Sequence, residues 1–203
     1  ADKFWAFIPA KCRQDPAVAG GIVVALVALI VAFGMWNAAH TVWRQYDIAI
    51  DKPAGGLREL KIILVTDVHL GKVVGNSRLE SLVEAINARE PDLVLLGGDV
   101  IDEDIGHFVD QGMAATFRLL HPRFGVFAVL GNHEYIGRQT EVAVELLRSS
   151  GITVLRDSYF TVMDHFIVAG RDDWDRPRFT NTQRKPLQEF LKGVVTQKPL
   201  LLL

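Results

Sequence analysis

The segment Ile62-Ile63-Leu64-Val65-Thr66-Asp67-Val68-His69 passes from an apolar run directly into a polar loop. Two later segments repeat this order, Leu93–Asp99 with the sequence LVLLGGD and Val126–Glu134 with the sequence VFAVLGNHE. Each segment is followed by a stretch in which apolar residues recur at helical spacing. In open α/β sheets, the loops that follow the strands gather at the carboxyl ends of those strands. The three segments therefore predict an α/β domain whose polar loops share one crevice.

Strands and helices are expected to alternate from Leu60 onward. Apolar runs predict strands at Leu60–Thr66, Asp92–Gly97 and Gly125–Leu130, and helices near Ser77–Ala88, Phe108–Leu120 and Thr140–Ser150. Three further strands follow too closely for crossover helices, at Ile152–Leu155, Phe160–Asp164 and Phe166–Gly170. The last two should pair antiparallel, because Asp164-His165 between them has the character of a tight turn. The expected product is a mixed α/β sheet covered by helices.

The polar loops carry four short motifs, namely Asp67-Val68-His69, Gly98-Asp99-Val100-Ile101-Asp102, Gly131-Asn132-His133-Glu134 and Gly170-Arg171-Asp172-Asp173. Aspartate, asparagine and histidine supply the oxygen and nitrogen ligands that Mn²⁺, Fe and Zn²⁺ accept. The alternative for any one of these residues is a turn former or a helix N-cap, since both positions favour Asp and Asn. The recurrence at successive strand ends favours a shared metal site.

The order D-x-H, G-D-x-x-D, G-N-H-E resembles the calcineurin-like metallophosphoesterases, and is most similar to their membrane-anchored bacterial members. The resemblance covers Leu60 to the C-terminus. It implies two sheet layers stacked as a sandwich and flanked by helices. It also implies a dinuclear metal-dependent phosphoesterase, which hydrolyses a phosphomonoester or phosphodiester by attack of a hydroxide that bridges the metals.

The resemblance assigns ligands to two divalent ions, with Mn, Fe or Zn as the candidates. Asp67 and His69 match the family's ligands to the first ion, and Asp99 matches the carboxylate that bridges both. Asn132 matches a ligand of the second ion. Two cations about 3.5–4 Å apart can hold a shared hydroxide in line with phosphorus and neutralise charge on the phosphoryl oxygens.

The resemblance also implies a catalytic pair, His133 as the acid near the leaving group and Asp102 as the carboxylate that orients it. A histidine with a pKa near neutrality can protonate the departing alkoxide, for a gain of about 10²–10⁴-fold. Asp102 could instead cap the next helix. Glu134 could be a partner of a ligand, but a first-turn acid that complements the helix dipole is the favoured interpretation.

Substrate contacts are expected from Arg171 and His107. Arg171 could contact a substrate phosphate with two hydrogen bonds, or form a structural ion pair with Asp172 or Asp173. His107 lies on a loop that should border the crevice. The polar stretch with Trp174, Arg176 and Arg178 could form a lip for a phosphorylated or lipid-like substrate, or a solvated loop.

The family completes its site with a further histidine and a G-H-x-H pair, whereas no histidine follows His165 in this chain. The resemblance therefore implies that the metallophosphoesterase domain, residues 60–203, lacks its C-terminal part and is inactive as given. The closing run Lys198–Leu203 is expected to form a strand buried on both faces. The alternative is a catalytically incomplete, membrane-tethered binding or scaffold module with the same fold.

The region before the domain has a different character. Residues 16–36 carry no charged or strongly polar side chain, and at about 1.5 Å per residue they match the 30 Å of a bilayer's hydrocarbon core. They predict a transmembrane helix, preceded by a juxtamembrane segment at 1–15 and followed by a linker with a first strand at 37–59. The alternatives are a cleaved signal peptide and a buried core helix.

The charges near this helix bear on location and partners. Three basic residues precede the helix, Lys3, Lys11 and Arg13, and two follow it, Arg44 and Lys52. Because the more basic flank tends to stay in the cytoplasm, this favours a domain on the extracytoplasmic side of a bacterial cytoplasmic membrane. The expected partners are membrane lipid and a phosphoester substrate, for which an anchor favours a lipid-linked class. A formal charge of −2 without a basic run argues against nucleic acid.

Overall fold

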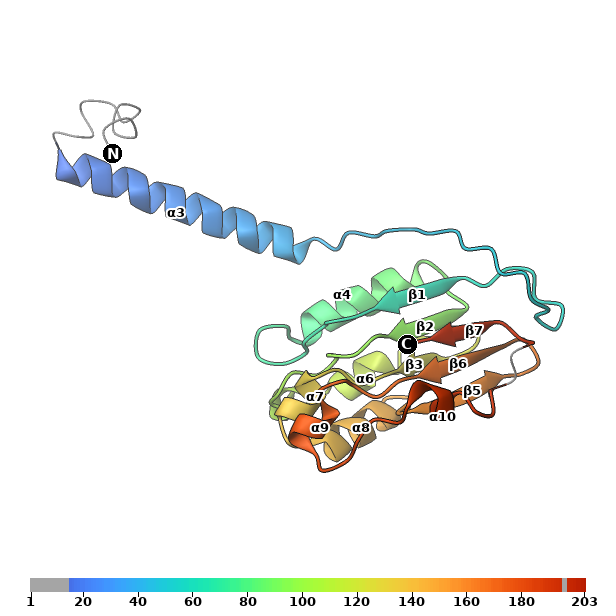
Figure 1. Ribbon diagram of the computed structural model, residues 1–203. Coiled ribbons are helices and arrows are strands. Elements are labelled where there is room, and N and C mark those ends of the chain that lie inside the picture. The colour runs from blue at the N-terminus through green and yellow to red at the C-terminus, as the bar shows by residue number, and fades with distance from the viewer. Residues whose placement is uncertain (1–14, 195–196) are drawn as a thin grey trace, which may run out of the picture. The chain divides into compact units, whose positions relative to one another are not determined.

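The computed structural model describes residues 15–194 and 197–203. The chain divides into two units, Ala1–Ala49 and Ile50–Leu203 (Figure 1). The first unit contains one long helix. The second contains the sheets and the three polar loops, so the candidate site belongs to this unit alone.

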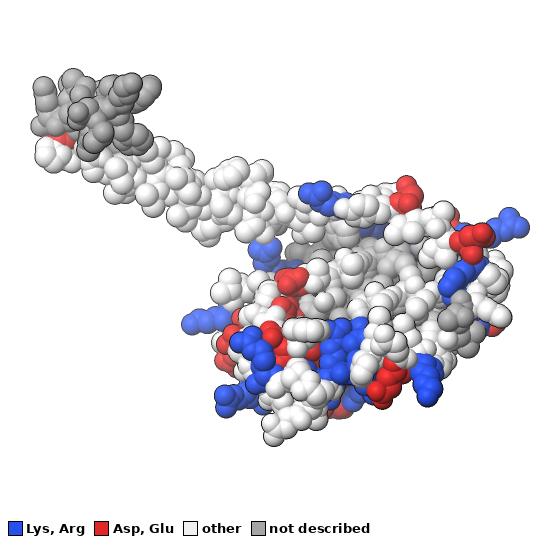
Figure 2. All heavy atoms as spheres, viewed as in Figure 1, with Lys and Arg blue, Asp and Glu red and all other residues white. Residues whose placement is uncertain are grey.

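Helix α3, Pro16–Ala39, is the helix of the first unit. Its N-cap Asp15 accepts a hydrogen bond from the Ala17 amide at 2.9 Å, and Pro16 suits the first turn, where no donor is needed. Its surface carries no charge from Pro16 onward (Figure 2). Within the described residues, Pro16–Ala38 is the one helical stretch long and apolar enough to cross a membrane, and none of it is buried. A signal sequence near an N-terminus can pass the same test of length and composition.

The linker contradicts one expectation. Between Tyr46 and Glu59, a region the structure describes throughout, the chain forms a turn but no strand. Tyr46 and Ile48 in this segment are 75% and 80% exposed, and no residue between Tyr46 and Glu59 takes part in a strand. The turn is attached to the domain by His165, whose Nδ1 lies 2.9 Å from the Ala54 carbonyl oxygen.

The first sheet of the domain is parallel throughout, with the order β1-β2-β3-β4. Its strands are β1 Ile62–Val65, β2 Leu93–Leu96, β3 Val126–Ala128 and β4 Ile152–Val154. All residues of β2 and β3 are buried, as expected for parallel strands covered on both faces. The carboxyl ends of β1, β2 and β3 therefore lie side by side at one edge (Figure 1).

Helices connect these strands. Helix α4, Asn76–Asn87, buries Leu79, Val83 and Ile86, and α8, Thr140–Ser149, buries an equivalent stripe. The prediction of a single helix at Phe108–Leu120 is wrong. The structure has two short helices there, α5 Gly106–Asp110 and α6 Met113–Phe117.

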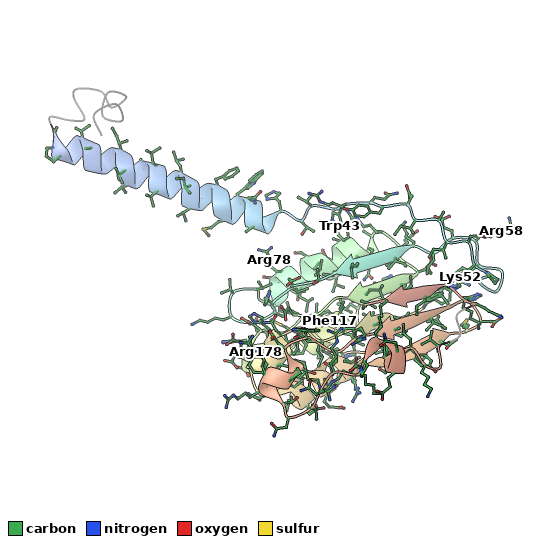
Figure 3. All side chains as sticks on the ribbon, viewed as in Figure 1. Trp43, Lys52, Arg58, Arg78, Phe117 and Arg178 are labelled. Atoms are coloured by element: carbon green, nitrogen blue, oxygen red, sulfur yellow. The ribbon has the colours of Figure 1, made fainter. Side chains whose placement is uncertain are left out.

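The break between α5 and α6 lies at Gly112, whose φ of 65° is left-handed and cannot continue a right-handed helix. The two pieces still share one buried face. Phe117, labelled in Figure 3, is 3% exposed and stacks on Phe108 with ring centroids 6.2 Å apart.

The second sheet has the order β5-β6-β7. Its strands are β5 Ser158–Val162, β6 Phe166–Gly170 and β7 Leu200–Leu202. The predicted antiparallel hairpin of β5 and β6 is confirmed, while β7 runs parallel to β6. Strand β4 belongs to the first sheet. The leucine strand is not buried on both faces as expected, because β7 occupies an edge of the described sheet and Leu202 is 51% exposed.

The two sheets pack face to face, which confirms the expected sandwich. Buried side chains from both sheets form one cluster, namely Leu93, Leu95, Phe124, Phe127, Leu155, Val162, Phe166 and Val168. Leu93 and Leu95 point into this layer, since alternate strand residues share a face. Each such side chain contributes about 1.5–3 kcal/mol by leaving water. This core fixes the strand ends from which the polar loops emerge.

Candidate metal centre

The three polar loops continue the pairing of the parallel strands. After β1 and β2 end, the Asp67 amide donates to the Gly98 carbonyl at 3.1 Å and the His69 amide donates to the Asp99 carbonyl at 2.9 Å. The first loop is thereby hydrogen-bonded to the second along its backbone. The third loop begins α7, His133–Ile136, directly after Gly131-Asn132. Residues distant in sequence thus meet at one edge of the sheet.

Three of the four predicted metal ligands have left-handed backbones. The φ angles are 57° at Asp67, 51° at His69 and 50° at Asp99. Such a conformation costs a residue with a side chain about 1–3 kcal/mol, although Asp and His tolerate it better than most. The main-chain bonds between the loops hold these residues in place. Their clustering at the strand ends is typical of a functional site.

Asp99, His69 and His133 form the one group of three histidine or acidic residues, among the described residues, whose ligand atoms all lie within 4.8 Å of one another. His69 Nε2 is 3.9 Å from Asp99 Oδ2, and the two imidazole rings lie edge to face with centroids 4.4 Å apart. Two imidazoles and a carboxylate are a donor set that Mn²⁺, Fe²⁺ and Zn²⁺ accept. The residues present therefore fit a divalent metal ion.

Asp102 and His133 meet as the motif order suggests. His133 Nδ1 lies 3.0 Å from Asp102 Oδ1, which leaves Nε2 as the second ring nitrogen. The alternative that Asp102 caps the next helix does not hold, because the N-cap of α5 is Ile105. His133 also belongs to the donor group, so its imidazole could bind an ion as well as act near the leaving group. Its predicted place off the metal and its role in proton transfer stay predictions.

Asp67 and Asn132 lie in the same loops. Asp67 Oδ2 accepts a hydrogen bond from Thr66 Oγ1 at 2.5 Å. Asn132 occupies the N-cap position of α7, but its side chain makes no capping hydrogen bond. The capping alternative therefore does not account for Asn132. Neither residue is a member of the three-residue donor group, so their predicted ligand roles stay predictions.

Glu134 has a role that its position in the sequence does not reveal. It is 3% exposed, and its carboxylate accepts from the amides of Val100 and Ile101 at 2.7 and 2.9 Å and of Gly131 and Asp99 at 2.8 and 3.2 Å. Burial raises the pKa of this carboxyl group, and these amide donors oppose the shift. The favoured interpretation, an acid that merely complements the dipole of α7, is therefore incomplete.

The fourth motif forms a buried charge network. Asp172 is 1% exposed and accepts from Arg176 Nη1 at 2.8 Å, from Arg156 Nε at 3.3 Å and from the Tyr135 hydroxyl. Burial raises the pKa of the next residue, Asp173, and the nearby Asp99 carboxylate adds to that shift. Through Tyr135, a residue of α7, the network contacts the helix that follows the third loop.

The structure places the expected substrate-contact residues outside the donor group. Arg171 Nε lies 3.3 Å from Asp157 Oδ1, so the structural ion pair exists, but with Asp157 in place of Asp172 or Asp173. His107 Nε2 lies 3.8 Å from Asp104 Oδ2. Within the described chain, no recorded contact joins Arg171 or His107 to the donor group. Substrate binding by either residue stays a prediction.

The three residues expected to form a lip for the substrate lie in different environments. Trp174 is 80% exposed, with the Arg184 guanidinium 5.7 Å from its ring centroid. Arg176 is committed to the buried network. Arg178, labelled in Figure 3 on α9 (Arg176–Phe179), reaches solvent beside Asp175 at 3.1 Å.

The model of the calcineurin-like phosphoesterases matches residues 60–198, which contain all four motifs. The chain belongs to this family. The family predicted from the motif order is thereby confirmed, and its bacterial subtype is left undecided.

Curated relatives come from animals and bacteria. The chain is 31% identical to a "Transmembrane protein with metallophosphoesterase domain" of Danio rerio, over 93% of this chain and 46% of the relative. It is 33% identical to an uncharacterized metallophosphoesterase of Aquifex aeolicus, over 86% of this chain and 67% of the relative. A protein of Bos taurus with the same name as the first is 28% identical, over 81% of this chain and 36% of the relative. The chain thus spans about half the length of the first of these relatives.

Proposed function

We propose that the protein is a membrane-anchored phosphoesterase that holds two divalent ions, Mn, Fe or Zn, between the loops after β1, β2 and β3. The observation that carries this proposal is the left-handed backbone of Asp67, His69 and Asp99 at adjacent strand ends. Ordinary turns would not need three strained residues with metal-binding side chains in one place. Membership of the calcineurin-like phosphoesterases supports the same reaction class.

In this proposal the loops divide the binding of the ions. Asp67 and His69 would hold the first ion, Asp99 would contribute to both, and the amide oxygen of Asn132 would hold the second. Two ions held there would supply a hydroxide nucleophile at neutral pH and neutralise charge on the phosphoryl oxygens. The Oδ1 atom of Asp99 accepts from the His133 amide at 2.9 Å, which fixes the direction of the carboxylate.

The chain's own residues then manage the proton of the leaving group. His133 donates a proton from Nε2 to the departing alkoxide oxygen, and Asp102 holds the ring through Nδ1. The ring lies on the first residue of α7, so its position relative to the ligand loops is set by main-chain bonds.

The anchor and its location are part of the proposal. Helix α3 is long and apolar enough to span a bilayer, and two relatives are named transmembrane proteins. We place the domain on the extracytoplasmic side of a bacterial cytoplasmic membrane, since three basic residues precede α3 and two follow it closely. An anchored enzyme has ready access to lipid-linked phosphoesters.

The competing proposal is a binding or scaffold module that keeps the fold without turnover. The test uses the whole protein, stripped of metal and then titrated with Mn²⁺. Bound metal is measured by calorimetry, and hydrolysis of bis(p-nitrophenyl) phosphate is followed in parallel. The phosphoesterase proposal requires that binding and hydrolysis rise together. Tight metal binding without hydrolysis would favour the module.

A further inference from the structure

The carboxylate of Glu134 joins two of the three ligand loops. Its Oε1 accepts from the amides of Val100 and Ile101, and its Oε2 accepts from those of Asp99 and Gly131. Three of these donors belong to the loop after β2 and one to the loop after β3. One side chain therefore holds together backbones that lie more than thirty residues apart in the sequence.

The first loop is tied to the same point indirectly. The His69 amide donates to the Asp99 carbonyl at 2.9 Å, and the Leu70 amide donates to the Val100 carbonyl at 2.9 Å. Asp99 and Val100 are the residues whose own amides donate to Glu134. A displacement of Glu134 would thus move the second loop, and the first loop with it.

Glycines at the contact allow the loops to lie this close. A Cβ atom added at Gly131 would overlap the Asp99 carboxylate and lie 2.6 Å from the Asp99 amide nitrogen. A Cβ atom added at Gly98, whose φ is 99°, would lie 2.8 Å from the Gly131 nitrogen. The backbones therefore pack against each other directly, with the Glu134 carboxylate as the polar group that satisfies their amides.

Glu134 itself is not placed to bind metal. Each of its oxygens already accepts two amide hydrogen bonds, and the residue is 3% exposed. The left-handed Asp99 backbone, at φ 50°, is held by these bonds and by its contact with His133. Strained conformations persist only where the surroundings over-determine them.

We propose that Glu134 is the positioning residue of the metal centre, which sets the spacing of the ligand loops by holding the Asp99 backbone in its left-handed conformation. The proposal rests on the proposed metal-binding function of Asp99 and His69. Glutamine at this position would be isosteric, but its NH₂ group would face two amide donors in place of an acceptor. Partners that orient metal ligands typically change metal affinity by about 10–100-fold when replaced.

The test compares Mn²⁺ affinity, measured by calorimetry on the whole protein, for the wild type and Glu134→Gln. The matched control is Glu145→Gln, an exposed glutamate of α8. The Glu134 variant should bind Mn²⁺ about 10–100-fold more weakly while the control binds like the wild type. Excess Mn²⁺ should restore its hydrolysis of bis(p-nitrophenyl) phosphate. Wild-type affinity in a folded Glu134→Gln protein would overturn the proposal and leave only a stabilising role.

A double-mutant cycle separates this inference from the proposed function. If Glu134 acts through Asp99, the variant Asp99→Asn/Glu134→Gln should bind Mn²⁺ no more weakly than Asp99→Asn alone. Fully additive losses would overturn the positioning role. If Asp99→Asn leaves metal binding intact, the proposed metal-binding role of Asp99 is wrong, and not the inference about Glu134. The Glu134 inference is then decided by amide exchange, which must accelerate at Val100 and Ile101 in Glu134→Gln.

A variant that retains the charge covers the case in which Glu134→Gln does not fold. Glu134→Asp keeps the carboxylate but is one methylene shorter, so it cannot accept from both loops at once. Its Mn²⁺ affinity should fall in the same direction. Wild-type affinity in Glu134→Asp would show that charge alone suffices, and would overturn the positioning role.

Discussion

The amide of His133 donates a hydrogen bond of 2.9 Å to Oδ1 of Asp99. The proposed acid and the proposed bridging carboxylate are therefore joined through the main chain, and neither can move without the other. Because α7 begins at His133, the first turn of this helix supplies the bond that directs Asp99 toward His69. The same bond makes the two residues separable by mutation, since it uses the backbone and not the imidazole.

Replacement of Asp99 by asparagine should remove most bound Mn²⁺ and nearly all hydrolysis of an activated phosphodiester. The amide offers one oxygen in place of two, and its NH₂ group would meet either the His133 amide or the metal. Calorimetry and a p-nitrophenolate release assay measure the two effects. The control is Asp104→Asn, whose side chain is 73% exposed. If Asp99→Asn retains both metal and turnover, the dinuclear site is wrong.

Replacement of His133 by alanine discriminates between an acid and a ligand. If His133 is an acid, His133→Ala should bind Mn²⁺ like the wild type, while its turnover of an alkyl phosphodiester should fall by about 10²–10⁴-fold. The loss should be smaller for a p-nitrophenyl ester, whose leaving group needs no proton. His133 is also a member of the donor group, so the competing possibility is that it binds the metal. Loss of Mn²⁺ together with a uniform loss across leaving groups would make His133 a ligand.

Asp102→Asn should lower turnover as His133→Ala does, but by a smaller factor. Asparagine keeps the shape of the side chain, yet its neutral amide oxygen is a weaker acceptor than a carboxylate for the Nδ1 proton of His133, so the ring is held less firmly. Turnover of an alkyl phosphodiester should fall more than that of a p-nitrophenyl ester, while the Mn²⁺ affinity stays constant. Wild-type turnover of both esters by Asp102→Asn would remove Asp102 from its orienting role.

Much of the fold follows from local signals in the sequence. Continuous apolar runs predict β2 and β3, because parallel strands covered on both faces leave no polar alternation. The run of β1 is equally apolar, although Leu64 in it is 63% exposed. The break at Gly112 also has a local cause, although a glycine inside a helical pattern only suggests it. The absent strand in the linker depends on something distant, namely a partner edge that the sequence cannot display.

In the candidate site too, some residues can be predicted from local sequence and others depend on distant contacts. Asp67, His69 and Asp99 are recognisable because residue type, spacing and position after a strand agree. Glu134 is not, since a first-turn glutamate looks the same whether it faces water or accepts hydrogen bonds from four amides, three of them in another loop. The partner of Arg171 likewise depends on the hairpin pairing, which brings Asp157 beside it.

Replacement of Gly131 by alanine should weaken Mn²⁺ binding although it changes the identity of no ligand residue. The new Cβ atom would overlap the Asp99 carboxylate, so the loops after β2 and β3 must separate. The control is Gly193→Ala, where the nearest atom is the Tyr159 hydroxyl oxygen at 3.3 Å. Calorimetry on both variants gives the comparison. Equal affinities would mean that the loops can move apart at no cost to the site.

Helix α3 should keep the protein in membranes through a high-salt or alkaline wash, because a spanning helix is held by hydrophobic burial. Leu26→Arg should reduce this retention, since arginine at a helix centre costs about 2.5–3.5 kcal/mol on insertion. The control is Val142→Arg on the exposed side of α8. The fraction in the membrane pellet is the measurement. Release of the unaltered protein by alkaline wash would exclude a spanning helix.

Asp172 should matter for stability more than any exposed acid of the domain. Its side chain is fully buried between Arg156 and Arg176, which are 21% and 20% exposed, so its removal takes the shared buried acceptor from two partly buried cations. Within the described residues, Arg156 then keeps only Glu141, and Arg176 only Asp157, as an acidic partner. Asp172→Ala should cost about 3–5 kcal/mol of unfolding free energy, read from urea denaturation. Asp175→Ala, which breaks only the pair with the exposed Arg178, should cost about 0–1 kcal/mol. Tyr135 also donates to Asp172 and follows Glu134 in α7, so a smaller loss of Mn²⁺ affinity should accompany the destabilisation. Similar unfolding free energies for the two variants would show that the network adds little to the fold.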